Sequence, residues 1–341
     1  MPYDQHMHAQ TLIEKHNRTF SSYYKGQLYT HTPMALLALT ELGATKARLN
    51  AFYQKSIAKL EAKKSSALKI TENNWTDYFG QQQAESAYIE FFQTEIERLG
   101  QEQMIAKYFD ALLPGMGAAA FHPLIRLFYA VRFNIAQEVV ISLATWASSY
   151  LDLALQTKID KQGSLLDSLQ AFQNNHFNKG KTILALNIAK RMQKVSRMSM
   201  FKELSTHITI RDLEPLALEE NLLWLFSQNN NFTLLHTITA HHAFTHLQHF
   251  SDQPKQALIL LCKALLAAYL STTGTVNIDF TWNYPKLNLP EWEALKEKAI
   301  QSNDEHVIKL LHVLSLKKRE NLTYQLKYAA ALKLNLIAFK D

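Results

Sequence analysis

Hydrophobic residues recur at every third or fourth position over most of the chain, and this period predicts amphipathic helices rather than strands. Short polar breaks, several of which contain glycine or proline, separate the periodic stretches. The helices expected from the pattern cover residues 34–42, 47–63, 84–109, 123–133, 136–155, 164–173, 182–202, 216–227, 233–250, 255–270, 306–316 and 321–339. Short breaks between neighbours favour packed helical hairpins.

Specific residues mark some of the expected helix ends. Gly43 is the type of residue that favours the left-handed C-cap position, and Gly100 is expected to interrupt the helix of residues 84–109. The sequence Ser302-Asn303-Asp304-Glu305 matches a capping box, in which the serine bonds forward to the backbone and the glutamate reaches back. We therefore expect Ser302 to cap the helix of residues 306–316.

Strand signals are few. They are confined to residues 207–210 and 275–280, and no alternation of strands with helices indicates a parallel sheet. The longest irregular stretch, residues 271–290, is either a lid or a packed crossover. No linker rich in Gly, Pro or Ser divides the chain, which contains only 9 Gly and 8 Pro. The sequence therefore predicts an all-α fold, with residues 1–341 forming a single large domain of helical hairpins around an internal pocket.

Composition narrows the class of protein further. The chain is 47% hydrophobic, enough for a substantial core, and its one cysteine, Cys262, lies in an apolar run typical of an inert core thiol. The N-terminal residues lack the basic and apolar regions of a signal peptide. No stretch approaches the roughly 20 uninterrupted apolar residues that a membrane helix needs. We therefore expect a soluble cytoplasmic protein that does not associate with membranes.

The net charge of +6 is concentrated in two places, residues 179–202 and a second stretch that begins with Lys317-Lys318-Arg319. Residues 179–202 contain many lysines and arginines and no acid. One interpretation is a nucleic-acid or membrane-surface patch. The other is the solvated face of an amphipathic helix, opposite an apolar stripe that includes Ile188, Met192 and Val195. Because no aromatic stacking module accompanies these lysines and arginines, we expect no nucleic-acid partner.

The strongest candidate for chemistry is His122, which comes directly before Pro123 at the predicted start of a helix. The helix dipole and any burial disfavour the charged imidazole there, and a neutral imidazole suits acid–base work or ligand binding. Three further histidines lie at or near predicted helix starts: His31, His236 and His306. If the hairpins pack around a common axis, these four side chains line one polar pocket. The alternative is a chance distribution among the 14 histidines.

Two cations follow these histidines by one helical turn. Arg126 lies four residues after His122, and Lys309 lies three residues after His306, so each pair shares a helix face. Such a cation can stabilise an anionic or enolate-like oxygen. The acids that offer an alternative ion pair are Glu138 and Asp304.

Other motifs point less clearly to chemistry. Residues 115–120 match the letters G-x-G-x-x-A, but the preceding residues predict a helix where a dinucleotide-binding motif needs a strand. No G-x-S-x-G or H-E-x-x-H occurs. Five histidines gather in one predicted helix: His236, His241, His242, His246 and His249. Two of them at helical spacing can chelate a metal, but a good site needs a third ligand.

Several blocks of sequence, in this order, resemble the questin oxidase-like family. The blocks are residues 29–36 (YTHTPMAL), 42–44 (LGA), 121–127 (FHPLIRL), 138–151 with Glu138-Val139, Trp146-Ala147 and Tyr150-Leu151, 232–243 (FTLLHTITAHHA) and 304–310 (DEHVIKL). The resemblance implies an oxidoreductase. It also implies Baeyer–Villiger oxidation of anthraquinone-type polyketide rings, as in characterised fungal members, with a reduced nicotinamide cofactor, NADPH.

Three functional interpretations follow. In the first, His122 and His306 act as bases, Arg126 and Lys309 stabilise an oxyanion, and His31, His236 and His241 bind an aromatic or polyketide-like ketone. The second is a non-catalytic helical protein that binds a small hydrophobic ligand, and the third is a histidine-ligated metal enzyme. The chain shows no flavin motif, and the sequence leaves the metal and the oligomeric state open.

Overall fold

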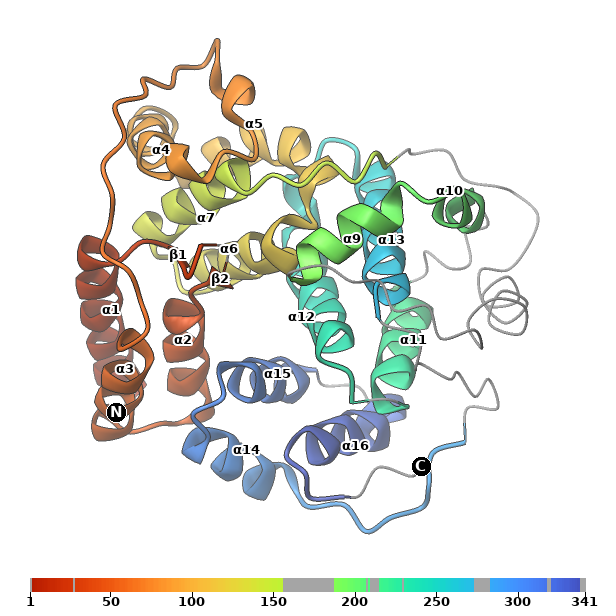
Figure 1. Ribbon diagram of the computed structural model, residues 1–341. Helices are drawn as coiled ribbons and strands as arrows, with labels where there is room; N and C mark the ends of the chain where they lie inside the picture. Colours follow the sequence, from red (N-terminus) through yellow and green to blue (C-terminus); the bar gives the residue numbers. More distant parts are fainter. Residues whose placement is uncertain are drawn as a thin grey trace. The chain divides into compact units, whose positions relative to one another are not determined.

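Helices dominate the computed structural model, which describes residues 2–26, 28–155, 187–206, 208, 215–228, 230–272, 283–317 and 320–337 (Figure 1). Within these residues the only strands form one antiparallel hairpin, β1 (Tyr23–Tyr24) with β2 (Leu28–Tyr29). The all-α prediction is therefore confirmed. The helix expected at 164–173 lies outside the described residues, as do the strand candidates at 207–210 and 275–280 apart from Ile208.

The chain divides into two compact units, one made of Met1–Lys64 with Trp282–Asp341 and the other of Ser65–Thr281. The first contains α1 (Pro2–Thr19), α2 (Thr32–Leu42), α3 (Lys46–Ile57), α14 (Trp292–Gln301), α15 (Glu305–Leu316), η8 (Glu320–Leu322) and α16 (Thr323–Lys333). The second contains η1 (Trp75–Tyr78), η2 (Gln82–Ala84), α4 (Glu85–Leu99), α5 (Gln101–Leu112), η3 (Leu113–Gly115), η4 (Ala118–Phe121), α6 (His122–Arg132), α7 (Ala136–Ser148), α9 (Ile188–Ser196), α10 (Ser199–Thr206), α11 (Pro215–Ser227), α12 (Phe232–Leu247), η7 (Gln248–Phe250) and α13 (Pro254–Leu270). That the units form one domain around an internal pocket stays a prediction.

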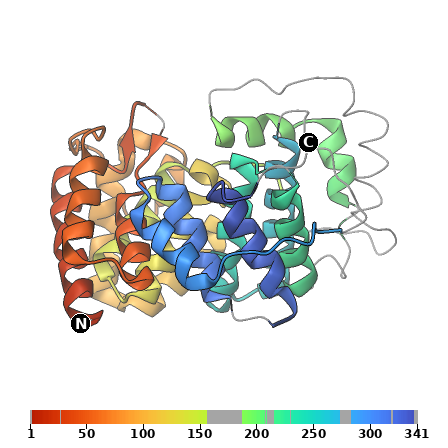
Figure 2. The ribbon, with the colours of Figure 1, turned by 90° about the horizontal axis from the view of Figure 1, so that it is seen from below.

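In the first unit, α2 is the central element. It packs against α1, α3, α14 and α15, and α1, α2 and α3 lie side by side (Figure 1 and Figure 2). The apolar run of this helix is almost wholly buried. Gly43 ends α2 with φ of 100°, the left-handed conformation that its lack of a Cβ permits. The C-cap predicted at Gly43 is confirmed.

In the second unit, the helices pack as a succession of neighbours. Helix α7 contacts α4, α5 and α6, α6 contacts α12, and α12 contacts α11 and α13. Helices α9 and α10 cover α13. Gly100 separates α4 from α5 as predicted, and its φ of 78° is again a conformation that favours glycine.

Some predicted boundaries are wrong. The helix expected at 47–63 ends at Ile57, because the backbone of Glu61 and Lys63 bonds instead to Ser21 and Thr19. The helix expected at 136–155 ends at Ser148, and the one expected to reach residue 202 is two helices, α9 and α10. Helices α1 and α14 were not expected from the pattern.

The predicted capping box is also wrong in its cap residue. Asp304, rather than Ser302, caps α15, because its carboxylate accepts the backbone N–H of His306 at 2.8 Å. The Ser302 hydroxyl accepts the N–H of Asp304 at 3.1 Å, one step earlier in the chain. Ser302, Asn303 and Asp304 are three consecutive residues that all favour the N-cap position, so the residue types alone do not decide which of them caps the helix.

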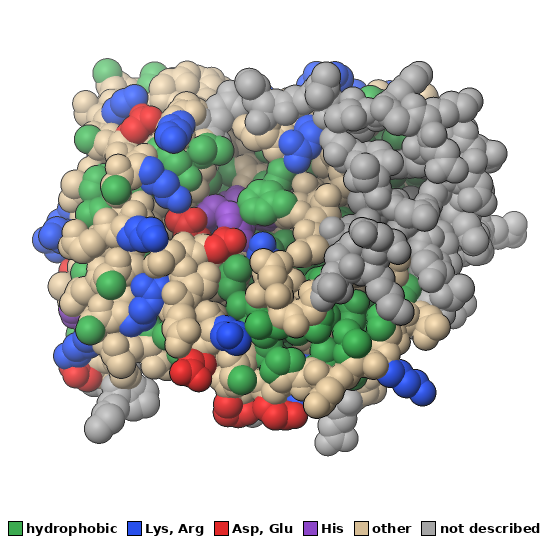
Figure 3. All heavy atoms as spheres, turned by 60° about the horizontal axis from the view of Figure 1, so that its bottom comes forward, with side chains coloured by type: hydrophobic (Ala, Val, Ile, Leu, Met, Phe, Trp, Pro, Cys, Tyr) green, Lys and Arg blue, Asp and Glu red, His purple; other side chains and the backbone are tan. Residues whose placement is uncertain are grey.

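The described part of the basic segment, residues 187–202, adopts the amphipathic arrangement. Ile188, Met192 and Val195 are buried on α9, while Lys190 and Lys194 are exposed. On the face that Figure 3 shows, Lys and Arg side chains are spread among other types and do not form one continuous patch. Across the residues described, no helix combines the length and apolarity required to span a bilayer.

Candidate functional site

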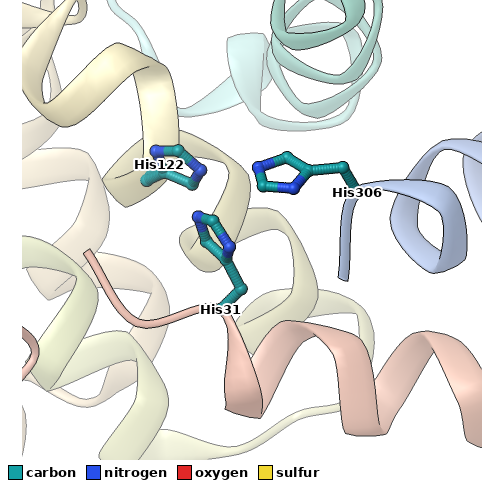
Figure 4. Close-up of side chains that lie close together, drawn as sticks. All are labelled: His31, His122 and His306. Atoms are coloured by element: carbon teal, nitrogen blue, oxygen red, sulfur yellow. The ribbon is translucent and has the colours of Figure 1, made fainter. Parts of the chain in front are cut away.

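Two of the four predicted histidines meet in the first unit. His31 comes directly before α2 and His306 lies in the first turn of α15, and their rings contact edge to face with centroids 4.5 Å apart (Figure 4). The side chains are 9% and 12% exposed. The structure therefore brings together imidazoles that are 275 positions apart in sequence.

Each of these imidazoles has a carboxylate beside it. The Nδ1 atom of His306 lies 3.2 Å from Asp304 Oδ1, and the Nδ1 atom of His31 lies 3.6 Å from Glu305 Oε2. Lysines balance both acids, since Lys59 Nζ is 2.9 Å from Glu305 and Lys333 Nζ is 3.8 Å from Asp304. The cluster is therefore electrically balanced when both rings are neutral.

Burial and hydrogen bonding set the charge states here. Burial raises the pKa of Asp304, but the bonds from the His306 ring and backbone outweigh it and hold this pKa far below its usual range. Burial lowers the pKa of His306, partly opposed by the bond to Asp304. The structure thus favours an ionised Asp304 beside a neutral His306, which is the state suited to accepting a proton.

Lys309 lies one turn after His306 on α15 and is 1% exposed. Burial lowers the pKa of Lys309 to about 7, although Glu305 and Asp304 attract its ammonium form. The ion pairs of Asp304 are made with Lys333 and His306, so the alternative of a direct Lys309–Asp304 pair is wrong. Lys309 is therefore a buried amine that exchanges its proton close to neutral pH.

The other two predicted histidines meet in the second unit. His122 begins α6 (Figure 4), and its ring centroid is 4.9 Å from that of His236 on α12. Both side chains are buried, at 6% and 1% exposure. The contact between α6 and α12 is what brings these rings together.

A strained turn positions His122. Ala119, Ala120 and Phe121 have φ of 42°, 57° and 70°, a left-handed run that non-glycine residues rarely adopt. This turn places the carbonyl oxygen of Ala119 within hydrogen-bonding distance of His122 Nδ1. Because a carbonyl only accepts, Nδ1 carries the hydrogen, and the lone pair of the neutral ring is on Nε2.

His236 has the same tautomer for the same reason. Its Nδ1 lies 2.8 Å from the carbonyl oxygen of Phe232, one turn earlier on α12. His122 and His236 therefore both present Nε2 as the basic atom. His241 is also buried, but it lies about 140° further round the helix from His236, given 3.6 residues per turn. A role for His241 in the same site stays a prediction.

Arg126 makes the ion pair that was the alternative to a catalytic role. Its Nε and Nη2 atoms each donate to Glu138 at 2.8 Å, and both side chains are 1% exposed. This bidentate pair ties α6, which carries His122, to α7. Contact between Arg126 and a substrate oxygen stays a prediction.

The histidine-dense helix does not assemble a three-ligand metal site. His242 and His246 contact each other with centroids 4.4 Å apart, and Phe128 packs against both. Within the described part of α12 and η7, no three His, Cys, Asp or Glu ligand atoms lie within 4.8 Å of one another.

The glycine-rich stretch is packed rather than open. A Cβ on Gly115 would lie 2.3 Å from the ring of Tyr150, and one on Gly117 would lie 2.9 Å from Leu153. Helix α5 and η3 come before it, which confirms the prediction that it is not a strand-borne dinucleotide motif. The side chains of Tyr150 and Leu153 thus fill the space beside the two glycines.

Residues 28–314 match the questin oxidase-like family, and the chain belongs to that family. The resemblance predicted from the sequence blocks is confirmed. No curated protein matches the chain. The matched range includes His31, His122, His236 and His306, and all four lie within or directly before the first two helical turns of α2, α6, α12 and α15.

The sequence did not reveal the side chains that hold the start of α15 in place. Arg48 on α3 donates from Nε to the carbonyl oxygen of Ile300 at 2.5 Å and from Nη2 to the carbonyl oxygen of Ser302, so it holds the loop that leads into α15. Lys59 and Lys333 balance the acids of that helix start. Contacts such as that between Arg48 and Ile300 join residues some 250 positions apart in sequence, so no local sequence pattern predicts them.

Proposed function

We propose that this protein is an oxidoreductase that carries out a Baeyer–Villiger-type oxidation of an aromatic or polyketide-like ketone. Membership of the questin oxidase-like family supports the reaction class. The single observation that supports the site is that His122 and His236, both buried, have Nδ1 bonded to backbone carbonyls and so present basic Nε2 atoms. Two fixed neutral imidazoles are suited to removing a phenolic proton.

The reaction sets clear demands on the side chains. One atom of O₂ is inserted between the carbonyl carbon and its neighbour, and the other becomes water with two electrons from a reductant. An electron-rich substrate is activated by loss of a phenolic proton, and the tetrahedral adduct carries an oxyanion. A base and a cationic or N–H donor near the carbonyl meet these two demands.

The charged groups of the first unit match those demands. His306 is held neutral and accepts a proton, and Lys309, in its ammonium form, stabilises the oxyanion. His31, whose ring contacts that of His306, binds the aromatic substrate through its ring edge and nitrogens. In the same proposal Arg126 supports the site through α6, because its guanidinium is already engaged by Glu138.

A test needs a readout that identifies the reaction. Purified protein is supplied with NADPH as reductant, an oxygen electrode and a panel of hydroxyanthraquinones under ¹⁸O₂. The proposal expects substrate-dependent oxygen uptake and a product heavier by one ¹⁸O atom. His122→Ala abolishes the uptake, while His249→Ala, at an exposed position of η7, leaves it unchanged. Binding of the quinone without uptake by wild type contradicts the proposal and supports the ligand-binding protein.

A histidine-ligated metal enzyme is the second candidate, because three of the histidines hold Nδ1 in local bonds and direct Nε2 elsewhere. Bonding of the second ring nitrogen is usual for metal-bound histidine. Elemental analysis of untagged protein, with His122→Ala and His236→Ala beside it, decides the point. A stoichiometric transition metal lost in these variants supports this candidate.

A further inference from the structure

One carboxylate oxygen of Asp304 contacts both the backbone N–H and the ring of His306. Its Oδ1 accepts the backbone N–H of His306 at 2.8 Å and lies 3.2 Å from the ring Nδ1 of His306. The residue that caps α15 thereby also fixes the direction of the ring. Most N-caps satisfy backbone groups alone, so the second contact is a separate feature of this helix start.

The surroundings keep Asp304 as a hydrogen-bond acceptor. Lys333 on α16 lies 3.8 Å from its other oxygen, and the N-terminus of α15 favours a negative charge. Arg48 donates to the carbonyl oxygens of Ile300 and Ser302 and to the side chain of Asn303, so the loop that leads to Asp304 is held at three points. An ionised carboxylate has no hydrogen to donate, so the ring nitrogen facing it donates.

We infer that Asp304 is a positioning residue that holds His306 as its Nδ1–H tautomer and so makes Nε2 the atom that accepts a proton. The consequence for turnover rests on the proposed function, whereas the tautomer does not. Orienting carboxylates behind a histidine act in this way in hydrolytic triads and at metal-bound histidines.

The same helix provides a matched comparison. His312, two turns along α15, bonds through the other ring nitrogen, with Nε2 2.6 Å from Glu41 Oε2 on α2. The side chain of His312 is 1% exposed. One helix therefore carries two histidine–carboxylate pairs bonded through opposite nitrogens, and they are expected to hold opposite tautomers.

Nitrogen-15 NMR of the full chain, labelled at histidine, reads the tautomers directly. Signals are assigned with His306→Gln and His312→Gln. We expect a protonated Nδ1 in His306 and a protonated Nε2 in His312 at neutral pH. Asp304→Ser retains a helix-capping hydroxyl but is too short to orient the ring, so it should shift His306 toward the Nε2–H form. Glu41→Gln should perturb His312 and leave His306 unchanged.

The outcomes separate the inference from the proposed function. A wild-type His306 in the Nε2–H form, or ¹⁵N shifts of His306 unchanged by Asp304→Ser, overturns the inference. In the oxygen-uptake assay Asp304→Ser should lower kcat by about 10- to 100-fold with little change in KM. If the tautomers are as expected but the wild type takes up no oxygen, the positioning role of Asp304 is supported and the proposed function is contradicted. If the wild type takes up oxygen and Asp304→Ser has the same kcat, the positioning role is overturned.

Discussion

Glu138 accepts two hydrogen bonds of 2.8 Å from the guanidinium of Arg126, and neither side chain is more than 1% exposed. Removal of one partner leaves a buried charge without its counter-ion. Arg126→Ala should therefore lower the free energy of unfolding by about 3–5 kcal/mol, measured by urea denaturation. The double change Arg126→Met, Glu138→Leu should cost much less, because neither charge remains.

An exposed ion pair is the control for this prediction. The Lys46 Nζ and Asp4 Oδ1 atoms are 2.7 Å apart, with side chains 45% and 70% exposed, and Lys46→Ala should leave the free energy of unfolding almost unchanged, because water screens this pair. A loss of similar size at both sites would mean that burial of the Arg126–Glu138 pair has no special role in holding α6 to α7.

Lys309 should make stability depend on pH. Burial lowers its pKa from 10.5 to about 7, so between these values the unfolded chain binds a proton that the folded chain does not. Its contribution therefore increases the free energy of unfolding as pH rises from 7 to 10.5. The full difference is roughly 5 kcal/mol at most, at 1.36 kcal/mol per pKa unit.

Lys309→Met removes this dependence. We expect the variant to be more stable than wild type at pH 7 and the difference to shrink toward pH 10, as measured by thermal unfolding across that range. Lys190→Met, at an exposed position of α9, is the control and should give parallel curves. A wild-type stability that falls across this range, relative to Lys309→Met, would contradict a depressed pKa.

Gly115 is required by close packing rather than by backbone conformation. An added Cβ would meet the ring of Tyr150 at 2.3–2.8 Å, and that ring is stacked on Phe79. Gly115→Ala should therefore cost about 1–3 kcal/mol of unfolding free energy. Gly115→Ala with Tyr150→Leu should recover part of the loss, and calorimetry of the single and double variants measures it. No recovery in the double variant would show that Tyr150 is not the obstacle.

The helical fold was readable from the sequence because it rests on local signals. The spacing of apolar residues predicted the ends of α2, α6, α12 and α13 within one or two residues. The exception is the end of α12, which was expected at residue 250 and lies at Leu247. Helix α1 was missed because most of its residues are polar, and it is held by packing on α2 and α3. The end of α3 depends on backbone bonds to residues 19 and 21, which no local pattern contains.

The candidate site was predictable only in part. The histidines were visible because each stands beside a helix start, and the ion pair of Arg126 with Glu138 was one of the alternatives that spacing allowed. The sequence pattern placed Asp304 in a capping box, but nothing in that pattern indicates that its carboxylate also faces the His306 ring. Charge balance by Lys59 and Lys333 arises from tertiary packing, which helical periodicity does not specify.

The proposed function requires the paired imidazoles of His122 and His236 to act together in one oxidation. Rates of oxygen uptake with a hydroxyanthraquinone and NADPH test this most directly, for wild type, His122→Ala, His236→Ala and the double variant, with far-UV circular dichroism as the check on folding. We expect each single change to lower kcat/KM at least about 100-fold and the double variant to lose little more, because the effects of residues that act in one step are not additive. Folded single variants with the wild-type rate, or losses that multiply in the double variant, would contradict it.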